Sequence, residues 1–391
     1  MHSWEQRKLD DVLKRRIEQR QQSEEYPRLA FASGQGVIPL SERKTNNREQ
    51  LTKDEYTKKY LVTELNDIVY NPANVKYGAI DRNKCGRGVI SPIYVTFTTN
   101  EVPGFIERIV TSHDFQQRAL RFEEGTVTKR QSVNPEDLVT LDILVAPKRE
   151  EQQKIATYFD ALDHLITLHQ RKYDETKTLK KYMLQKMFPQ NGEKVPEIRF
   201  DGFTEDWEQR KLGDNIVEYT EKTTENNQYP VLTSSRKGIF FQTDYYDGNQ
   251  IASADNTGYN IVPYGYFTYR HMSDDEIFHF NINDIAENGI VSTLYPVFTT
   301  DENLDSRYLQ YQLNYGREFA RYAILQKQGG SRTYMYLNKL RNLYLTVPTA
   351  IEEQKKISEY FTNLDHLITL HQRKCNELKE IKKYMLQNMF V

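Results

Sequence analysis

The chain has 391 residues, and its 53 Lys and Arg against 55 Asp and Glu leave a formal net charge of −2. That length predicts about two or three domains and excludes a peptide or a single small module. The balanced charge excludes a global basic field, so nucleic acid or an anionic membrane would have to be met locally. Hydrophobic residues make up 38%, and no run approaches the ~20 apolar residues of a membrane span. No apolar core follows residues 1–8, so we expect no signal peptide and a cytoplasmic location.

The chain opens on a Trp-bearing lead that occurs twice. Residues 4–9 read WEQRKL, and residues 207–212 read the same. A longer repeat ends each half, because residues 150–188 align with residues 352–390 over 39 positions, of which 11 differ and 28 are identical. Between each lead and its tail lies a head of about 130 residues that diverges between the halves. The sequence is therefore one unit of lead, head and tail, written twice.

The two divergent heads have the pattern of mostly-β domains. Residues 90–98 and 261–269 alternate and are rich in β-branched and aromatic residues, which predicts short strands joined by Gly and Asn turns. Residues 110–122 and 306–323 predict shorter helices. We therefore expect α+β heads in which strands dominate.

The two tails have the heptad spacing of a coiled-coil seam. The seam runs through Ile155, Phe159, Leu162, Ile166, His169 and Tyr173 in the first tail, and through Ile357, Phe361, Leu364, Ile368, His371 and Cys375 in the second. At ~1.5 Å per residue, each tail would form a rod of roughly 58 Å. The expected fold class is α+β, with two mostly-β domains separated by two long antiparallel α-helices in a coiled coil, as a pseudo-two-fold internal repeat.

No motif in the chain carries an enzymatic reaction. The string at 71–74, Asn-Pro-Ala-Asn, lacks the second Pro and the aromatic residue of an adenine-methyltransferase loop and is interpreted as a turn. There is no GxxxxGK[ST] phosphate loop, and the Glu-x-Lys triplets at 175–177 and 377–379 lie on the tails as solvated charge. Cys85 and Cys375 have no CxxC partner. We expect a non-catalytic chain without a cofactor or a metal.

The order of these segments resembles the specificity (S) subunit of type I restriction-modification systems. The resemblance is carried by the WEQRKL lead, by the helix motif Glu-Glu-Gln-x-Lys-Ile-x-x-Tyr-Phe and by the Arg199–Phe203 approach to the second lead, and it spans essentially the whole chain. It implies target recognition domain 1 at 1–147, conserved helix 1 at 148–190, a linker and target recognition domain 2 at 191–349, and conserved helix 2 at 350–391. Each recognition domain would read one half of a bipartite, asymmetric sequence in double-stranded DNA. Two methyltransferase (M) subunits and restriction (R) subunits would assemble on the chain.

Neither head is basic as a whole, so we expect DNA to be contacted by clustered loop residues. Arg and Lys can pair with guanine, Asn and Gln with adenine, and Ser or Thr with phosphate. The candidates are Ser33, Gln35, Arg43, Lys44, Asn74, Lys76, Lys84, Arg87, Lys129 and Arg130 in the first head, and Ser234, Arg236, Lys237, Asn256, Arg270, Ser331, Arg332 and Tyr334 in the second. For any single member, a solvated surface side chain is at least as good an interpretation.

The tails are nearly identical where the heads are not, so we expect the M subunits to bind them. The candidate contacts are Leu165, Ile166 and Leu168 on the first tail and Leu367, Ile368 and Leu370 on the second.

Two other functions stay open. A structural coiled-coil adaptor with two protein-binding heads would show no salt-dependent, sequence-selective DNA affinity. A self-contained endonuclease would cleave DNA with a metal ion and no partner.

Overall fold

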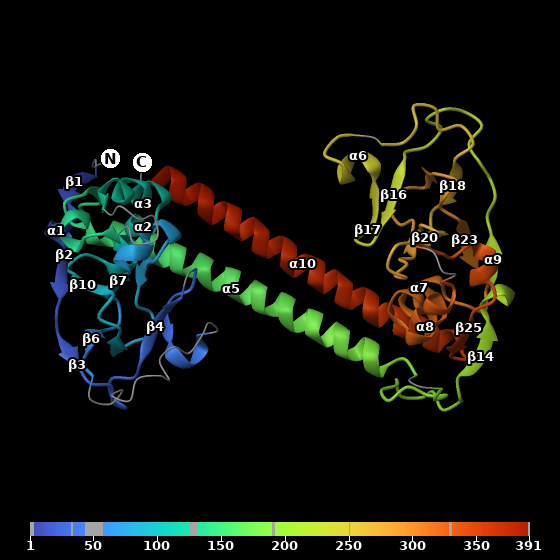
Figure 1. Cartoon of the computed structure of the whole chain (residues 1–391), viewed down its shortest axis with the longest axis horizontal. Coiled ribbons are helices and arrows are strands. Elements are labelled where there is room, and N and C mark those ends of the chain that lie inside the picture. Colours follow the sequence, from blue (N-terminus) through green and yellow to red (C-terminus); the bar gives the residue numbers. More distant parts are fainter. Residues whose placement is uncertain are drawn as a thin grey trace. The chain divides into compact units, whose positions relative to one another are not determined.

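The computed structural model describes residues 4–32, 34–43, 58–124, 132–189, 192–249, 251–327 and 331–389. The chain divides into two compact units. Unit 1 comprises Met1–Gln170 and Gln372–Val391, and unit 2 comprises Arg171–His371. Each unit thus holds one head, the start of one long helix and the end of the other (Figure 1). No helix among the described residues is long and apolar enough to cross a membrane.

The first unit contains the N-terminal head and both of its helix segments. Its elements in chain order are β1 (Glu5–Lys8), α1 (Leu9–Val12), β2 (Leu13–Arg16), β3 (Gln19–Arg20), β4 (Leu29–Ala32), β5 (Gly36–Pro39), η1 (Leu40–Glu42), β6 (Tyr60–Thr63), β7 (Ile68–Tyr70), η3 (Pro72–Tyr77), β8 (Ile80–Arg82), β9 (Gly88–Ile90), β10 (Val95–Thr99), α2 (Pro103–Val110), α3 (His113–Ala119), η4 (Leu120–Phe122), β11 (Glu123–Glu124), β12 (Ser132–Val133), α4 (Pro135–Leu138), β13 (Asp142–Val145) and the start of α5 (Arg149–Lys186).

A four-stranded antiparallel sheet, ordered β2-β10-β7-β8, forms the centre of this head. One apolar cluster joins it to the helices. The cluster includes Ile68, Phe97 and Phe105 from the head and Phe159 from α5, with Met385 from the last helix packed against it. The head therefore has a core of its own, and the long helices complete that core.

The second unit contains the other head. Its elements are β14 (Glu208–Lys211), η5 (Leu212–Asp214), β15 (Ile216–Glu218), β16 (Leu232–Ser235), β17 (Gly238–Phe241), α6 (Gln242–Tyr245), β18 (Asn260–Pro263), β19 (Phe267–Thr268), β20 (Met272–Ser273), β21 (Asn281–Ile282), β22 (Asn288–Val291), β23 (Val297–Thr300), α7 (Ser306–Tyr315), α8 (Arg317–Leu325), β24 (Thr333–Tyr334), α9 (Leu337–Leu340), β25 (Tyr344–Val347) and the start of α10 (Ile351–Met389).

The strand pairing of unit 1 recurs in unit 2. The first strand of each unit pairs with the last strand before the long helix, as β1 with β13 and as β14 with β25. The four-stranded sheet returns in the order β15-β23-β19-β21, and its core includes Phe267, Phe298 and Tyr308. The fold class expected from the sequence, mixed helix and strand with long helices beside sheet domains, is confirmed.

The repeated lead and helix motifs meet in space. In unit 1 the indole Nε1 of Trp4 donates to Glu151 Oε1 at 3.0 Å. In unit 2 the indole of Trp207 donates to Glu353 Oε1 at 3.3 Å. The Gln that follows each Glu accepts a backbone N–H from the head, as Gln152 from Val102 and as Gln354 from Asp305. These contacts, which are buried or part-buried, explain why the WEQRKL and Glu-Glu-Gln motifs occur together in both halves.

The shorter helices differ from the sequence expectation, because a break divides each of them. Residues 110–122 do not form one helix: α2 ends at Val110, and Ser112 then caps α3 by accepting the backbone N–H of Phe115 at 3.2 Å. Residues 306–323 likewise form α7 and α8, with Gly316 between them in an extended conformation.

The long helices are antiparallel within each unit. In unit 1, Asp163 of α5 pairs with Lys382 of α10, and the Sγ of Cys375 lies 3.5 Å from the Oε1 of Gln170. In unit 2, Lys180 pairs with Asp365 at 2.6 Å, and Phe188 stacks on Phe361. Residue numbers rise along one helix as they fall along the other, and the predicted seam residues Phe159 and Phe361 are fully buried.

Candidate nucleic-acid interface

An extended segment of the second head presents an aromatic and basic face. Side chains alternate along residues 332–337. Arg332, Tyr334 and Tyr336 are exposed, whereas Thr333, Met335 and Leu337 are buried. The segment is fixed by pairing of β24 with β20, where Tyr334 lies opposite Met272. A strand that buries one face and exposes the other places the three exposed side chains in one row.

The rings of this row form a stack. The Tyr334 and Tyr336 rings are 5.8 Å apart at 11°, and Tyr336 stacks on His271 at 4.8 Å. His271 is buried, and its Nδ1 donates to the Leu294 carbonyl, which fixes the ring. Tyr334 and Tyr336 remain 38% and 47% exposed. The result is a rigid aromatic surface with a free edge, suited to a sugar, a thymine methyl group or a base.

An acidic segment pairs the cations around this face. Asp274 accepts from Arg332 Nε at 2.8 Å, Asp275 accepts from both Nη atoms of Arg236, and Glu276 pairs with Lys327. The Arg236 guanidinium and the Ser273 hydroxyl hold the pKa of Asp275 well below its usual range. All three pairs are solvent-exposed, and such pairs are weak enough for phosphate to replace the carboxylates.

The remaining candidates of the second head fall into two groups. Lys237, Arg270 and Ser331 are exposed. Ser234 and Asn256 are buried instead: the Ser234 hydroxyl donates to the Thr268 carbonyl, and the Asn256 side chain bonds the backbone and amide of Asn227. Because their polar groups are used inside the head, we leave Ser234 and Asn256 out of the proposed surface.

The candidates of the first head are less concentrated. Gln35 is exposed on a turn, Asn74 is exposed in η3, and Arg43 is half-buried. Lys84 pairs with Glu107 at 2.6 Å, and Arg87 pairs with Glu25 at 2.8 Å and with Glu64 at 3.1 Å. The backbone of Lys76 lies in η3. Four further candidates, Ser33, Lys44, Lys129 and Arg130, lie outside the described residues.

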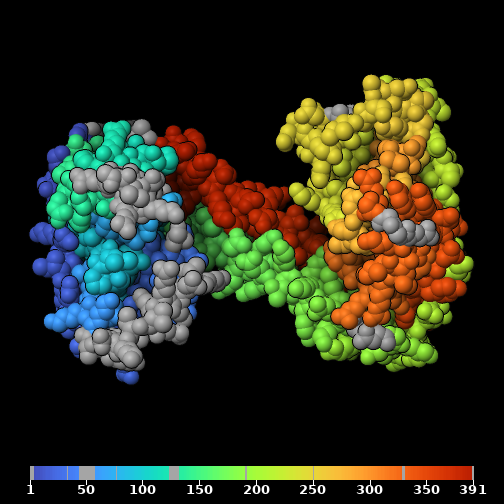
Figure 2. All heavy atoms as spheres, in the orientation of Figure 1, coloured from blue at the N-terminus to red at the C-terminus, as the bar shows by residue number. Residues whose placement is uncertain are grey.

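Apolar side chains on the long helices remain in contact with solvent. Leu165 is 40% exposed, Leu367 43% and Leu370 40%, while Ile166, Leu168 and Ile368 are half-buried. Leu179 and Ile381 are exposed two heptads further along the face of Leu165 and Leu367. Side chains of α10, in red, form part of the surface on the face shown in Figure 2. These exposed side chains lie off the intramolecular seam, and each unit carries its own: Leu165 and Ile381 in unit 1, and Leu179, Leu367 and Leu370 in unit 2.

The sequence interpretation missed Tyr336 and His271. The string 331–337, Ser-Arg-Thr-Tyr-Met-Tyr-Leu, does alternate polar or aromatic residues with residues that are buried, which is a signal for a half-buried strand. His271 has no such signal, since only the pairing of β20 with β24 brings it beside Tyr336. Among the described residues, no group of three His, Cys, Asp or Glu is placed to hold a metal ion.

The geometry defines a class of protein: a repeat of two units, each with a strand-rich head anchored by a Trp, Glu and Gln motif to paired long helices. Residues 204–380 match the family model described as Type I restriction modification DNA specificity domain. The resemblance to type I specificity subunits drawn from the sequence is thereby confirmed. No curated protein matches the sequence.

A solved structure shows the same fold, and a second is reported beside it as a weaker similarity. The chain is similar to the S subunit of a type I restriction-modification system from M. genitalium, with 12% identity and a TM-score of 0.59, covering 99% of this chain and 96% of that one. It is also similar to the HsdS subunit from Thermoanaerobacter tengcongensis, with 15% identity and a TM-score of 0.45, covering 99% and 96%.

Proposed function

We propose that this chain is the non-catalytic DNA-recognition subunit of a cytoplasmic type I restriction-modification complex. The match of residues 204–380 to the DNA specificity domain carries the proposal, because unit 1 repeats the same strand pairing and the same helix anchor. Two different heads held by the same kind of helix anchor suit a DNA target with two different halves. The heads, at residues 1–147 and 191–349, would each read one half-site in double-stranded DNA.

The row of Arg332, Tyr334 and Tyr336 supports the role of the second head. An Arg can pair with a guanine edge or a phosphate, and a rigid aromatic ring adds apolar contact with a thymine methyl group or deoxyribose. We expect Tyr334→Ala with Tyr336→Ala to weaken binding to the cognate duplex by ~1 to 3 kcal/mol, mostly through one or two base positions of one half-site. Tyr344→Ala is the matched control, because Tyr344 is an exposed tyrosine on β25 of the same head. Equal losses in both variants would remove the row from the interface.

The exposed stripe on α5 and α10 supports assembly with two M subunits. Because the stripe recurs on both helices with the same residue types, each helix would hold one copy. Replacing Leu165 and Leu168 with Glu should remove one M subunit from the co-purified complex, and replacing Leu367 and Leu370 should remove one as well. Retention of two M subunits in both variants would contradict this docking surface. The R subunits would join the assembled complex.

The deciding experiment measures methylation directly. The chain is expressed with its cognate M subunits in a host without other DNA methylation, and the methylated sequences of the host genome are mapped. We expect one asymmetric motif with two defined halves and a gap between them. With an adaptor that has two protein-binding heads, no motif in the genome would be methylated, and the chain would show no salt-dependent, sequence-selective DNA affinity.

A further inference from the structure

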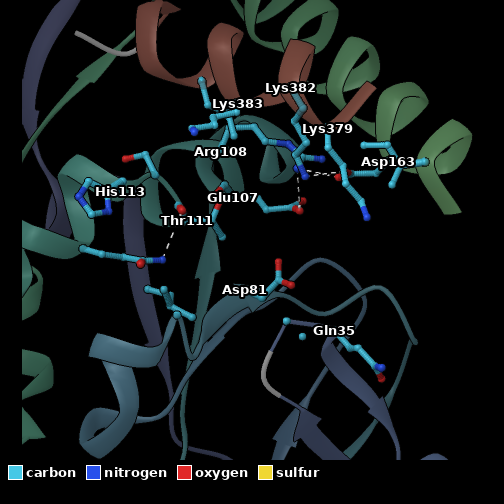
Figure 3. Close-up of a pocket in the computed structure, with 18 of the residues that line it drawn as sticks. Gln35, Asp81, Glu107, Arg108, Thr111, His113, Asp163, Lys379, Lys382 and Lys383 are labelled. Atoms are coloured by element: carbon cyan, nitrogen blue, oxygen red, sulfur yellow. Dashed lines mark hydrogen bonds and ion pairs between the residues drawn. The ribbon is translucent and has the colours of Figure 1, made fainter. Parts of the chain in front are cut away.

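A cleft in unit 1 has no role in the proposed function. It has a volume of about 1160 Å³ and opens between the end of α10 and the first head (Figure 3). Lys379, Lys382 and Lys383 of α10 form one wall, and Gln35 and Asp81 lie on the opposite side. A volume of this size is ample for a small ligand, since sites for such ligands are about 300–1000 Å³.

Most charges around the cleft neutralise one another. Lys382 and Arg108 both pair with Asp163, and Lys84 pairs with Glu107. Asp114 pairs with Arg118 at 2.9 Å. Two ammonium groups remain, on Lys379 and Lys383, and neither has a partner among the residues that the structure describes. Four residues apart on one helix, they line the same wall of the cleft, where both could approach one anion.

Asp81 is the carboxylate left over on the opposite side. Its Oδ1 accepts the backbone N–H of Arg82 at 2.7 Å. Its Oδ2 lies against Gly36, where a Cβ would come within 2.2 Å of it, so only glycine fits there, and the φ of +72° also favours glycine. Burial and the charge of Glu107 raise the pKa of Asp81 to about 6, against the opposing charges of Lys84 and Arg108. Near pH 7.5 Asp81 is therefore an ionised acceptor, and it makes no ion pair among the described residues.

The equivalent position of unit 2 lacks this feature. There Asn281 donates to the Ser234 hydroxyl and to the Ser235 carbonyl, and it is buried under the β16–β17 hairpin. The free carboxylate is therefore specific to unit 1 and is not needed to build the repeated sheet.

We propose that the cleft binds a nucleotide, with its phosphate between Lys379 and Lys383 and the exocyclic amino group of cytosine or adenine at Asp81. Lysine is a common phosphate ligand, and a carboxylate accepts a hydrogen bond from an exocyclic amine such as cytosine N4. Ile80, Ile166 and Leu386 line the cleft and offer apolar contact to the base and sugar. The nucleotide is either free or part of a DNA strand, and only the second source rests on the proposed function.

The test uses calorimetric titration of the full chain with dCMP, dAMP, dTMP and deoxycytidine. We expect dCMP and dAMP to bind at least tenfold more tightly than dTMP, which has no exocyclic amine, and deoxycytidine to bind more weakly than dCMP. Asp81→Asn should abolish the preference over dTMP. Lys379→Ala with Lys383→Ala should weaken dCMP at least tenfold. Lys148→Ala with Lys154→Ala, two exposed lysines of unit 1 that do not line the cleft, should leave every affinity unchanged.

A trinucleotide of deoxycytidines separates the two sources. Binding of the trinucleotide but not of dCMP, with the same dependence on Asp81 and the two lysines, identifies a DNA strand as the source. The inference is overturned if neither binds at millimolar concentration, if the control variant weakens binding as much as the cleft variants, or if an oligoglutamate peptide binds more tightly than any nucleotide. Because the methylated motif is measured separately, failure here is distinct from failure of the proposed function.

Discussion

One residue position shows how differently the two heads attach to nearly identical helices. In unit 1, Arg108, which is 2% exposed, donates to Asp160 and Asp163 of α5 at 2.8 Å each. In unit 2 the corresponding residue is Tyr311, whose hydroxyl donates to Asp365 at 2.8 Å and lies 3.5 Å from the Thr362 hydroxyl. Asp160 and Thr362 are among the few positions at which the tails differ. The residue on the long helix thus differs together with the head residue that it contacts: Asp160 faces Arg108, and Thr362 faces Tyr311.

We expect Asp160→Thr to destabilise unit 1, because it removes a carboxylate from the buried Arg108 and from Arg82. Breaking one side of a buried ion pair costs about 3 to 5 kcal/mol, and the partial exposure of Asp160 places the cost near the lower end. Adding Arg108→Tyr should recover part of the loss, since it recreates the pair found in unit 2. Urea unfolding of both single variants and the double variant gives the coupling. Strictly additive losses would show that the two residues are independent.

Asp81 gives unit 1 a pH dependence of known sign. Its folded pKa, about 6, lies above its ordinary 3.8. The stability that protonated Asp81 contributes is fully present below about pH 4 and is lost as the pH rises through 6. Asp81→Asn should therefore be more stable than the parent at pH 7.5 by up to roughly 3 kcal/mol, seen as a higher unfolding temperature, with no gain at pH 4. An equal gain at both pH values would mean that ionisation is not the cause.

At the scale of elements, the sequence pattern is most informative for the long helices. The repeat at 150–188 and 352–390 differs by one or two residues from the observed Arg149–Lys186 and Ile351–Met389. A long heptad pattern is local and repeated, so it defines a helix without knowledge of the rest of the fold. The strands are harder, because β1 pairs with β13 across the whole head, and no local pattern sets that register.

The candidate site could be predicted only in part for the same reason. The composition of the segment at Arg332 and Tyr334 identifies it as a candidate. Its neighbours, β20 and His271, come from a distant part of the sequence and could not be predicted. Ser234 and Asn256 have the composition of surface loops, yet long-range hydrogen bonds bury them. Ion pairing is equally invisible in the sequence, since Asp274 lies 58 residues before Arg332.

The acidic segment at residues 274–276 should weaken DNA binding by the second head. Replacing Asp274, Asp275 and Glu276 with their amides frees Arg236, Lys327 and Arg332, so we expect tighter binding to any duplex and a steeper fall of affinity with salt. Stability should change by no more than ~1 kcal/mol per pair, because the pairs are exposed. Affinities at two salt concentrations provide the measurement.

A matched variant separates this local effect from net charge. Glu225→Gln, Asp244→Asn and Glu302→Gln remove three exposed carboxylates of unit 2 that have no ion-pair partner among the described residues. We expect a smaller gain from this control. If both triple variants tightened binding equally, the acidic segment would have no specific relation to the arginines.

At the scale of the whole molecule, each head has its own core. The polar contacts between each head and the long helices involve only a few residues, which recur in both units. The apolar cluster of unit 2 draws on Trp207, Phe267, Tyr308 and Phe361, all of them within residues 171–371. The core of unit 1 uses none of these residues. A head should therefore be exchangeable without unfolding the other, provided that its contacts with Glu353, Gln354 and Asp365 are kept.

Exchanging residues 229–348 for the corresponding part of another specificity subunit tests this independence. The exchanged segment includes Tyr311 and the row from Arg332 to Tyr336, whereas the Trp207 lead and α10 stay in place. We expect the methylated motif to change in one half only, because the first head and its anchor on α5 are unaltered. The donor should carry Tyr at the position of Tyr311, since Thr362 of α10 matches it, and a donor with Arg there should require Thr362→Asp for full stability. Methylated motifs are mapped for the parent and both exchanges. A change in both halves of the motif would show that the heads read DNA jointly, and the independence inferred from their separate cores would be wrong.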